Sequence, residues 1–152
     1  MSKFDSSSRI IQLLDEIHHE MYHKKKYKDV ATQFNMSKEQ VWILWKLRRA
    51  KKRHKKEYSV GQLAKMCNVA QNTMSERITR LTERGFVTRI QNPNDRRKYI
   101  VELNKTGEDL LTYIDEEHKR LFALEIEESL STEKRKILTN LLSELVSNIR
   151  EE

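Results

Sequence analysis

Residues 60–103 read VGQLAKMCNVAQNTMSERITRLTERGFVTRIQNPNDRRKYIVEL, and the periodicity of their apolar side chains changes along the segment. In the first part, apolar residues recur at helical intervals in two series, and Asn68-Val69 interrupts the pattern between them. Two short helices joined by a tight turn form a helix-turn-helix. The apolar members of the two series are Leu63, Ala64 and Cys67, followed by Met74, Ile78 and Leu81.

The second of these helices has a polar face opposite its apolar stripe. Amide, hydroxyl and carboxylate side chains on this face can exchange hydrogen bonds with the edges of DNA bases, and two arginines lie near its edges. Gly85 follows the last turn, where a C-terminal cap with positive φ costs glycine least. The predicted DNA-contacting residues of this helix are Gln71, Asn72, Thr73, Ser75, Glu76, Thr79 and Arg80, and Arg84 is the second edge arginine.

After Gly85 the pattern changes to that of strands. Residues 87–90 and 99–103 are β-branched or aromatic runs, and the polar segment between them holds the only proline of the chain, Pro93. The tip of this segment is basic. We therefore predict a β-hairpin that acts as a wing beside the helix-turn-helix, with Arg96, Arg97 and Lys98 as further DNA-contacting residues.

Several short motifs agree in order and spacing with one known family. They are Leu63-Ala64, the helix from Thr73 with its ending Leu-Thr-Glu-Arg-Gly-Phe-Val87, Asn92-Pro-Asn-Asp-Arg-Arg97, Leu103-Asn-Lys-Thr-Gly107 and Met36-Ser-Lys-Glu-Gln40. On these residues the chain resembles MarR-type winged helix-turn-helix transcription regulators. The resemblance implies that the helix at 70–84 enters the major groove and that Arg97 reaches the minor groove. It also implies that the Asp95 carboxylate braces the wing.

Two positions depart from the pattern of the family. Ala70 stands where a serine usually caps the recognition helix, so the first amides of that helix would lack a side-chain oxygen. Arg77 stands where a leucine is common. Either the helix is rotated slightly, or Arg77 pairs with another group, for which Asp95 is one candidate.

The whole chain has 152 residues, which suits one domain, and 37% of them are hydrophobic and 35% charged. No run approaches the roughly 18 consecutive apolar residues of a membrane span, and the first eight residues hold no apolar leader segment. We expect a cytoplasmic protein that is mainly α with a small β-hairpin wing. Residues 37–103 would form the DNA-binding winged helix-turn-helix, and residues 1–36 and 104–152 a helical dimerisation region.

Positive charge is concentrated in the part that contains the helix-turn-helix. Residues 1–103 hold 23 Lys/Arg against 11 Asp/Glu, whereas residues 104–152 hold 7 against 12, within a net charge of +7. A polyanion-binding protein has this organisation, although lysine-rich surfaces are also common on helical proteins. Residues 48–56 alone carry seven Lys/Arg. They form either a second phosphate contact or the solvated end of a helix, and the sequence leaves both readings open.

Amphipathic helices flank the winged segment on both sides. A first helix with one apolar face is predicted around residues 10–21, and Ser37 with Gln40 is a capping-box signature for the next. Beyond the wing, residues 104–109 signal the start of a long helix and Ser131 the start of another, whose apolar stripe is wide. In the resembled family the first and last helices of two protomers interleave. We therefore expect a homodimer with two reading heads for a two-fold DNA site.

No motif for catalysis is present in the sequence. The three glycines, Gly61, Gly85 and Gly107, stand at helix boundaries, so no glycine-rich phosphate cradle exists. Neither His-Glu-x-x-His nor Gly-x-Ser-x-Gly occurs. We expect no enzymatic activity and no cofactor.

The histidines have two readings, as zinc ligands or as an ordinary polar face, whereas the single cysteine is assigned to the core. His19 and His23 are four residues apart and could chelate zinc, with His118 as a further ligand if the two helices meet. An ordinary polar face is the favoured reading, because no cysteine or matched carboxylate accompanies them, so no metal is predicted. Cys67 cannot form an intramolecular disulfide, and we expect it to pack as a small hydrophobe in the core.

A small-molecule pocket is implied by the resemblance, between the dimer helices and the reading head. Four aromatic residues either line such a pocket or serve only in packing: Tyr22, Trp42, Trp45 and Tyr113. The leading hypothesis is a dimeric transcription regulator, a repressor released by a ligand, that binds a pseudo-palindromic operator. The alternative is a winged-helix module for protein contacts or nonspecific chromosome binding, without an effector.

Overall fold

The structure, a computed structural model, describes residues 3–54 and 57–150, and the side chains of residues 3–5, 22, 25–28 and 53–54 lie outside this description. The chain divides into two compact units, Tyr22–Asp115 and Met1–Met21 with Glu116–Glu152. The two units are defined by which residues contact one another. The predicted regions 1–36, 37–103 and 104–152 were instead defined by their expected roles in dimerisation and DNA binding. The difference arises because residues before 37 and after 103 pack with the winged segment. Val30 and Leu111, for example, are buried.

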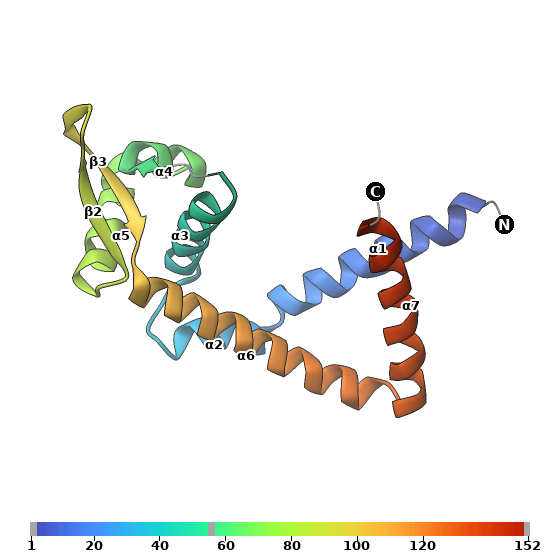
Figure 1. Cartoon of the computed structure of the whole chain (residues 1–152). Helices are drawn as coiled ribbons and strands as arrows, with labels where there is room; N and C mark the ends of the chain where they lie inside the picture. The colour runs from blue at the N-terminus through green and yellow to red at the C-terminus, as the bar shows by residue number, and fades with distance from the viewer. Residues whose placement is uncertain (1–2, 55–56, 151–152) are drawn as a thin grey trace. The chain divides into compact units, whose positions relative to one another are not determined.

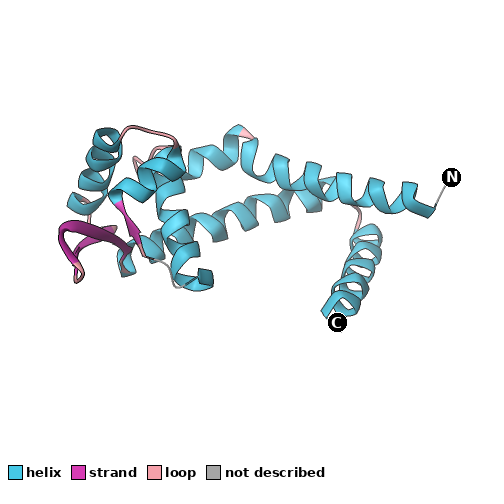
Figure 2. Ribbon diagram, turned by 90° about the horizontal axis from the view of Figure 1, so that it is seen from above, coloured by secondary structure: helices cyan, strands magenta, loops and turns pink. Residues whose placement is uncertain are grey.

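The unit Tyr22–Asp115 is mostly helical and carries a small antiparallel sheet (Figure 1). The π-helical turn Ala50–His54 follows α3 directly. Strands are confined to this unit among the described residues, as the magenta ribbons show (Figure 2). The elements are α2 (Lys25–Thr32), α3 (Lys38–Arg49), β1 (Tyr58–Ser59), α4 (Val60–Cys67), α5 (Gln71–Glu83), β2 (Val87–Asn92), β3 (Asp95–Leu103) and the first turns of α6 (Lys105–Ser129).

Local signals set the ends of these helices. Ser37 and Gln40 form the predicted capping box at the start of α3, and Ser59 with Gln62 forms a second one at the start of α4. Between α4 and α5, Asn68 adopts a left-handed conformation with φ of 52°, which ends α4 and turns the chain. Gly85 has φ of +77°, as predicted for the residue after the recognition helix. The helix-turn-helix is therefore confirmed.

The sheet has the strand order β1-β3-β2, and both pairs are antiparallel. β2 and β3 form the predicted wing hairpin, with Ile90 opposite Ile100 and an irregularity between Gln91 and Asn92. At the tip, the Asn92 side chain accepts a hydrogen bond from the backbone N–H of Asn94 at 2.9 Å. β1 was not predicted, because a strand of two residues leaves no alternation to detect.

The core of this unit is formed where α3, α4 and α5 meet the sheet and α6. Both predicted apolar series are largely confirmed, since Leu63, Met74, Ile78 and Leu81 are 0% exposed. Cys67 differs from the prediction, because it is half-buried rather than part of the core. The largest fully buried side chains are Ile43, Leu44, Leu63, Met74, Ile78, Leu81, Leu111, Ile114, Val30, Val87 and Val101.

The first turn of α6 is fixed against the segment that precedes β2. Asn104 donates from Nδ2 to the Gly85 carbonyl at 2.7 Å, and its Oδ1 accepts the Gly107 N–H at 3.0 Å, so it caps α6. A Cβ at position 107 would lie 2.3 Å from the Phe86 carbonyl oxygen and 2.5 Å from a Leu103 methyl carbon. Only glycine allows this approach of α6 to the wing.

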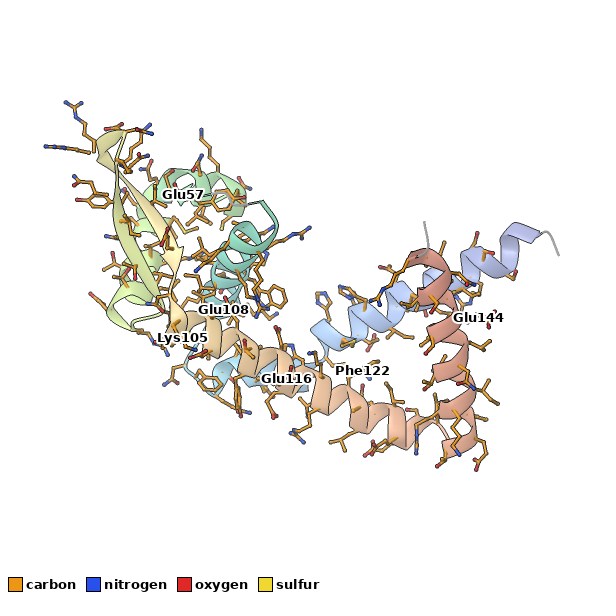
Figure 3. All side chains as sticks on the ribbon, in the orientation of Figure 1. Glu57, Lys105, Glu108, Glu116, Phe122 and Glu144 are labelled. Atoms are coloured by element: carbon orange, nitrogen blue, oxygen red, sulfur yellow. The ribbon has the colours of Figure 1, made fainter. Side chains whose placement is uncertain are left out.

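Arg48 connects the end of α3 to α6 inside the unit. Its Nη2 lies 2.5 Å from Asp115 Oδ2, with the two side chains 9% and 24% exposed, and its guanidinium stacks on the Trp45 ring at 4.3 Å. Lys52 pairs with Glu108 of α6 at 2.9 Å. Glu108 is labelled on α6 in Figure 3. Arg48 is therefore a structural cation, and at this position neither reading of residues 48–56 applies, since Arg48 is neither a phosphate contact nor part of a solvated helix end. Part of that run, from residue 53 onward, has side chains outside the description.

The other unit consists of helices with exposed apolar faces. It contains most of α1 (Lys3–His23), the rest of α6, and α7 (Thr132–Arg150). α7 has no buried residue, and Leu141 and Ile149 are 59% and 66% exposed. Large apolar side chains also stay exposed on α1, where Ile11 is 68% exposed. The described residues thus leave substantial apolar surface uncovered.

Candidate nucleic-acid interface

The helix α5 presents a polar face, as the sequence predicts, but the face is not uniformly exposed. Gln71, Asn72, Thr73, Glu76 and Arg80 are exposed, whereas Ser75 and Thr79 are half-buried. The N-cap residue Ala70 makes no side-chain hydrogen bond to the helix. The exposed members of the face are therefore concentrated in the first turns of α5.

Ser75 and Thr79 are half-buried because Arg89 of β2 reaches across to them. Its Nη2 donates to the Ser75 carbonyl at 3.0 Å and to Thr79 Oγ1 at 2.7 Å. Arg89 is not among the residues that the sequence pattern predicts to be functional. The available signal was strand alternation, since Arg89 lies on the same side of β2 as buried Val87 and so points inward.

A groove of about 860 Å³ runs between the start of α4, the start of α5 and the wing. Asn72, Ser75 and Arg97 line it together with residues that the sequence analysis did not single out, such as Tyr99, which is 48% exposed. Among the described residues that line the groove, the charged ones are Lys65, Arg89, Arg97 and Lys98, and none is a carboxylate. A concave surface with one sign of charge concentrates anions.

The wing tip is basic and internally hydrogen-bonded. Arg96, Arg97 and Lys98 are exposed. Asp95 Oδ1 accepts the backbone N–H of Arg97 at 3.0 Å, and Lys98 Nζ lies 3.9 Å from the same carboxylate. Gln91 donates from Nε2 to the Arg96 carbonyl at 2.8 Å. These bonds fix the backbone that carries the cations.

Arg77 does not pair with Asp95, which corrects one of the two explanations for its departure from the family pattern. Asp95 bonds within the wing, whereas Arg77 lines a cavity of about 350 Å³ with Trp42, Met66 and Cys67. Burial raises the pKa of the Cys67 thiol, and the positive charge of Arg77 opposes this shift. The cavity also includes Lys38, Glu39 and Val69.

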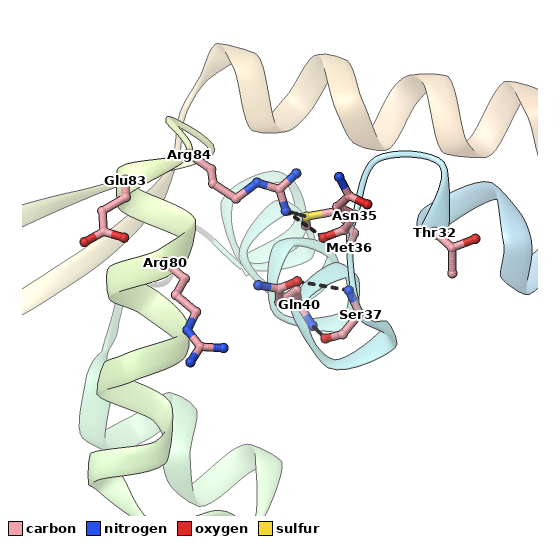
Figure 4. Close-up of a pocket in the computed structure, with 8 residues that line it drawn as sticks. All are labelled: Thr32, Asn35, Met36, Ser37, Gln40, Arg80, Glu83 and Arg84. Carbon is pink, nitrogen blue, oxygen red and sulfur yellow. Dashed lines mark hydrogen bonds between the residues drawn. The ribbon is translucent and has the colours of Figure 1, made fainter.

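The C-terminal end of α5 is held by Arg84. Its guanidinium donates to the Phe34 carbonyl and, at 2.9 Å, to the Asn35 carbonyl in the loop between α2 and α3. Figure 4 shows Arg84 reaching this loop, while Glu83 points away from it. Arg84 thus anchors the far end of the recognition helix and, unlike Arg80, is committed to protein contacts. A cavity of about 680 Å³ lies beside this contact, lined by Thr32, Asn35, Met36, Ser37, Gln40, Arg80, Glu83 and Arg84.

The aromatic residues proposed for a ligand pocket enter separate contacts. Trp42 lines the cavity beside Arg77, Trp45 lies against Arg48, and the Tyr113 ring meets the Phe34 ring edge-on at 5.1 Å. The side chain of Tyr22 is outside the described residues. Of the three whose side chains the structure describes, Trp42 is thus the one that lines this cavity.

Within residues 3–54 and 57–150, no group of three or more His, Cys, Asp or Glu side chains is placed to hold a metal ion, and His19, His23 and His118 form no such group. Within the same part of the chain, every helix falls short of the length and apolar character that crossing a bilayer requires.

Comparison with known sequences gives one family and one curated relative. Residues 36–99 match the model of the MarR family. YdgJ of Bacillus subtilis, an uncharacterised HTH-type transcriptional regulator, is 28% identical over 96 residues, which cover 63% of this chain and 58% of that protein. The alignment thus spans less than two thirds of the relative's length.

Solved structures share the fold over nearly the whole chain. The transcriptional regulator Tm0710 of Thermotoga maritima has a TM-score of 0.71 at 24% identity, with 95% of this chain and 96% of that chain covered. A variant of S. aureus MepR, bound to an oligodeoxyribonucleotide, has a TM-score of 0.67 at 20% identity, with 92% and 97% covered. A variant of E. coli MarR, complexed with operator DNA, has a TM-score of 0.56 at 19% identity, with 95% and 99% covered.

Proposed function

Because residues 36–99 form a winged-helix domain of the MarR family, we propose that this chain is a transcription regulator that binds double-stranded DNA through α5 and the wing. The observation that carries the proposal is the groove between α4, α5 and the wing, whose charged lining residues are all cations. A helix in the major groove and a hairpin in the adjacent minor groove leave one DNA strand between them. The cationic groove suits the phosphates of that strand.

In this arrangement some residues contact base edges and others contact the phosphate backbone. Gln71, Asn72 and Glu76 are exposed near the start of α5, where they can meet base edges. Arg97 at the wing tip enters the minor groove, and its neighbours Arg96 and Lys98 neutralise phosphates.

We also propose that the protein acts as a homodimer on a pseudo-palindromic operator. The support is the exposed apolar surface of α1 and α7, which a second copy of the same chain would cover. A two-fold dimer presents two copies of α5, and these match two half-sites related by symmetry.

We further propose that the protein represses transcription and that a small molecule releases it from DNA. The cavity beside Arg77 supports it, because a molecule seated there would contact both Trp42 of α3 and Arg77 of α5. Such a ligand would bias the position of α5 only if it bound one position better than another.

Selection of bound sequences from a random duplex pool tests the proposed function. A consensus with two-fold symmetry is the expected result, and equal affinity for selected and random duplexes would instead support a nonspecific module. The selected duplex then serves as the probe for variants.

Asn72→Ala should weaken binding to the selected duplex by about 1–3 kcal/mol, the usual value of one good base contact. Asn72 is exposed on the first turn of α5, so the loss would come from the interface and not from the core. Fluorescence anisotropy with selected and random duplexes measures it. Random-duplex affinity should stay constant, and Asn140→Ala on α7 should change neither value. Equal losses on both duplexes would argue against base reading by Asn72.

Arg97→Ala should weaken specific binding and reduce the slope of log affinity against log salt by about 0.9, as expected when one phosphate-type contact is lost. Arg97→Lys should restore the slope but not all of the affinity, because an ammonium lacks the planar guanidinium that inserts into a narrow groove. Titrations at several salt concentrations give both values. Arg150→Ala removes an exposed arginine of α7 and is the control. An unchanged affinity in Arg97→Ala would remove the wing from the interface.

A further inference from the structure

The contact between Arg89 and α5 crosses from one half of the DNA-binding surface to the other. Arg89 lies on β2, and its two acceptors, the Ser75 carbonyl and Thr79 Oγ1, lie one turn apart on α5. Thr79 in turn donates its hydroxyl proton to the same Ser75 carbonyl at 2.9 Å. The hydroxyl is thus committed as a donor to the helix and as an acceptor to the arginine.

The other contacts that the described residues make with α5 do not replace these bonds. Ala70 provides no side-chain cap at the start of the helix, and Arg84 holds only the opposite end. Met74, Ile78 and Leu81 bury the inner stripe, but apolar burial is not directional and provides no bond aimed from α5 to the wing. Arg89 therefore supplies the directional contact in the middle of the helix.

The arginine is held even though its bonding is incomplete. Among the described side chains, Arg89 Nε is the buried polar atom without a hydrogen-bond partner. An unsatisfied buried N–H is unfavourable. The surrounding packing therefore holds the guanidinium in a position where it bonds both acceptors on α5, although its Nε then has no partner.

From this geometry we propose that Arg89 and Thr79 are positioning residues for DNA recognition. Together they fix the roll of α5 relative to the wing, so that Asn72 and Arg97 meet adjacent grooves in register. Thr79 acts through this contact and not by reading a base. The inference rests on the proposed DNA recognition by α5 and the wing.

The helix itself provides a matched control. Thr82 is also half-buried on α5, and its hydroxyl donates to the Ile78 carbonyl at 2.7 Å, just as Thr79 donates to Ser75. Thr82 has no bond to Arg89. Replacing either threonine with valine removes one hydroxyl from the same helix without changing charge.

The test uses the full chain and measures affinity for the selected duplex and for a random duplex of equal length. Thr79→Val and Arg89→Gln should each lower the ratio of the two affinities about tenfold, as expected for loss of a charge-assisted hydrogen bond. Thr82→Val should leave the ratio within about twofold. The Thr79→Val, Arg89→Gln double variant should lose no more than Arg89→Gln alone, because that change already removes the bond between Arg89 and Thr79. Arg89→Lys should recover part of the ratio.

Other outcomes would overturn the proposal. If Thr79→Val behaves like Thr82→Val, the hydroxyl has no positioning role. If Arg89→Gln weakens both duplexes equally and reduces the salt slope by about 0.9, Arg89 is a phosphate contact. If Thr79→Val alters preference at a single base pair and Arg89→Gln does not, Thr79 reads that base.

A second measurement does not depend on DNA. Amide hydrogen exchange in residues 75–83 of the free protein should be faster in Thr79→Val and Arg89→Gln than in Thr82→Val, because the contact that holds the middle of α5 is lost. Equal exchange in all three variants would refute the contact. A wild-type protein that shows no duplex preference would refute the proposed function, whereas this exchange pattern would still decide the role of Arg89.

Discussion

Arg48→Ala is expected to lower the free energy of unfolding by about 3 kcal/mol. Removing one partner of a buried ion pair leaves the other as an uncompensated buried charge, which usually costs about 3–5 kcal/mol. The lower end applies because Asp115 keeps 24% of its side chain exposed. The substitution also removes the guanidinium that stacks on Trp45. Urea unfolding at fixed protein concentration measures the change as a shift in midpoint at constant slope.

The neighbouring arginine gives the control for this experiment. Arg49→Ala removes an exposed cation from the same helix end and should change stability by no more than about 0.5 kcal/mol. An Arg48→Met, Asp115→Leu double variant should be close to neutral, because two apolar side chains of similar size leave no buried charge. If Arg48→Ala lowered the free energy of unfolding no more than Arg49→Ala does, the ion pair would not contribute to the stability of the fold.

The double variant Leu141→Glu, Ile149→Glu is expected to convert the protein to a monomer and to weaken operator binding by at least about 100-fold. Both residues are more than half exposed in the single chain, so the change does not disturb a protomer core. Two carboxylates in a dimer interface would have to be buried without partners. Loss of the second reading head removes the gain from simultaneous binding of two half-sites, which is typically about 10²–10⁴.

Sedimentation velocity at micromolar concentration and anisotropy with the full operator measure the two effects. Ser147→Glu adds a carboxylate to the opposite side of α7 and should leave both assembly and affinity unchanged. A wild-type protein that sediments as a monomer would contradict the homodimer directly. A variant that stays dimeric would place the interface elsewhere.

The helix-turn-helix and the wing were predictable because their sequence signals are local. Helical spacing in residues 60–83, the positive φ of Gly85 and the β-branched runs of the wing each depend on residues close in sequence. α2 escaped prediction because an eight-residue helix of sequence KKYKDVAT has too few apolar positions to show a period, although Val30 and Ala31 are buried.

The roles of individual polar residues were less predictable, because their partners are distant. Arg48 looked like part of a basic run, and its partner Asp115 is 67 residues away. Thr79 shares the polar face of α5 with exposed residues, and only the position of Arg89 on β2 distinguishes it from them. Periodicity predicts which face of a helix or strand a residue occupies. It does not predict which residue of another element contacts that face.

The close approach of Gly107 to Phe86 has a mechanical consequence. Because a Cβ at position 107 would meet the Phe86 carbonyl and the buried Leu103 side chain, Gly107 brings the first turn of α6 into close backbone approach to the residue that leads into β2. The Asn104 bonds to Gly85 and Gly107 make the same connection a second time. We therefore expect a tilt of the start of α6 to be transmitted to the base of the wing as through a rigid lever, with little lost in between.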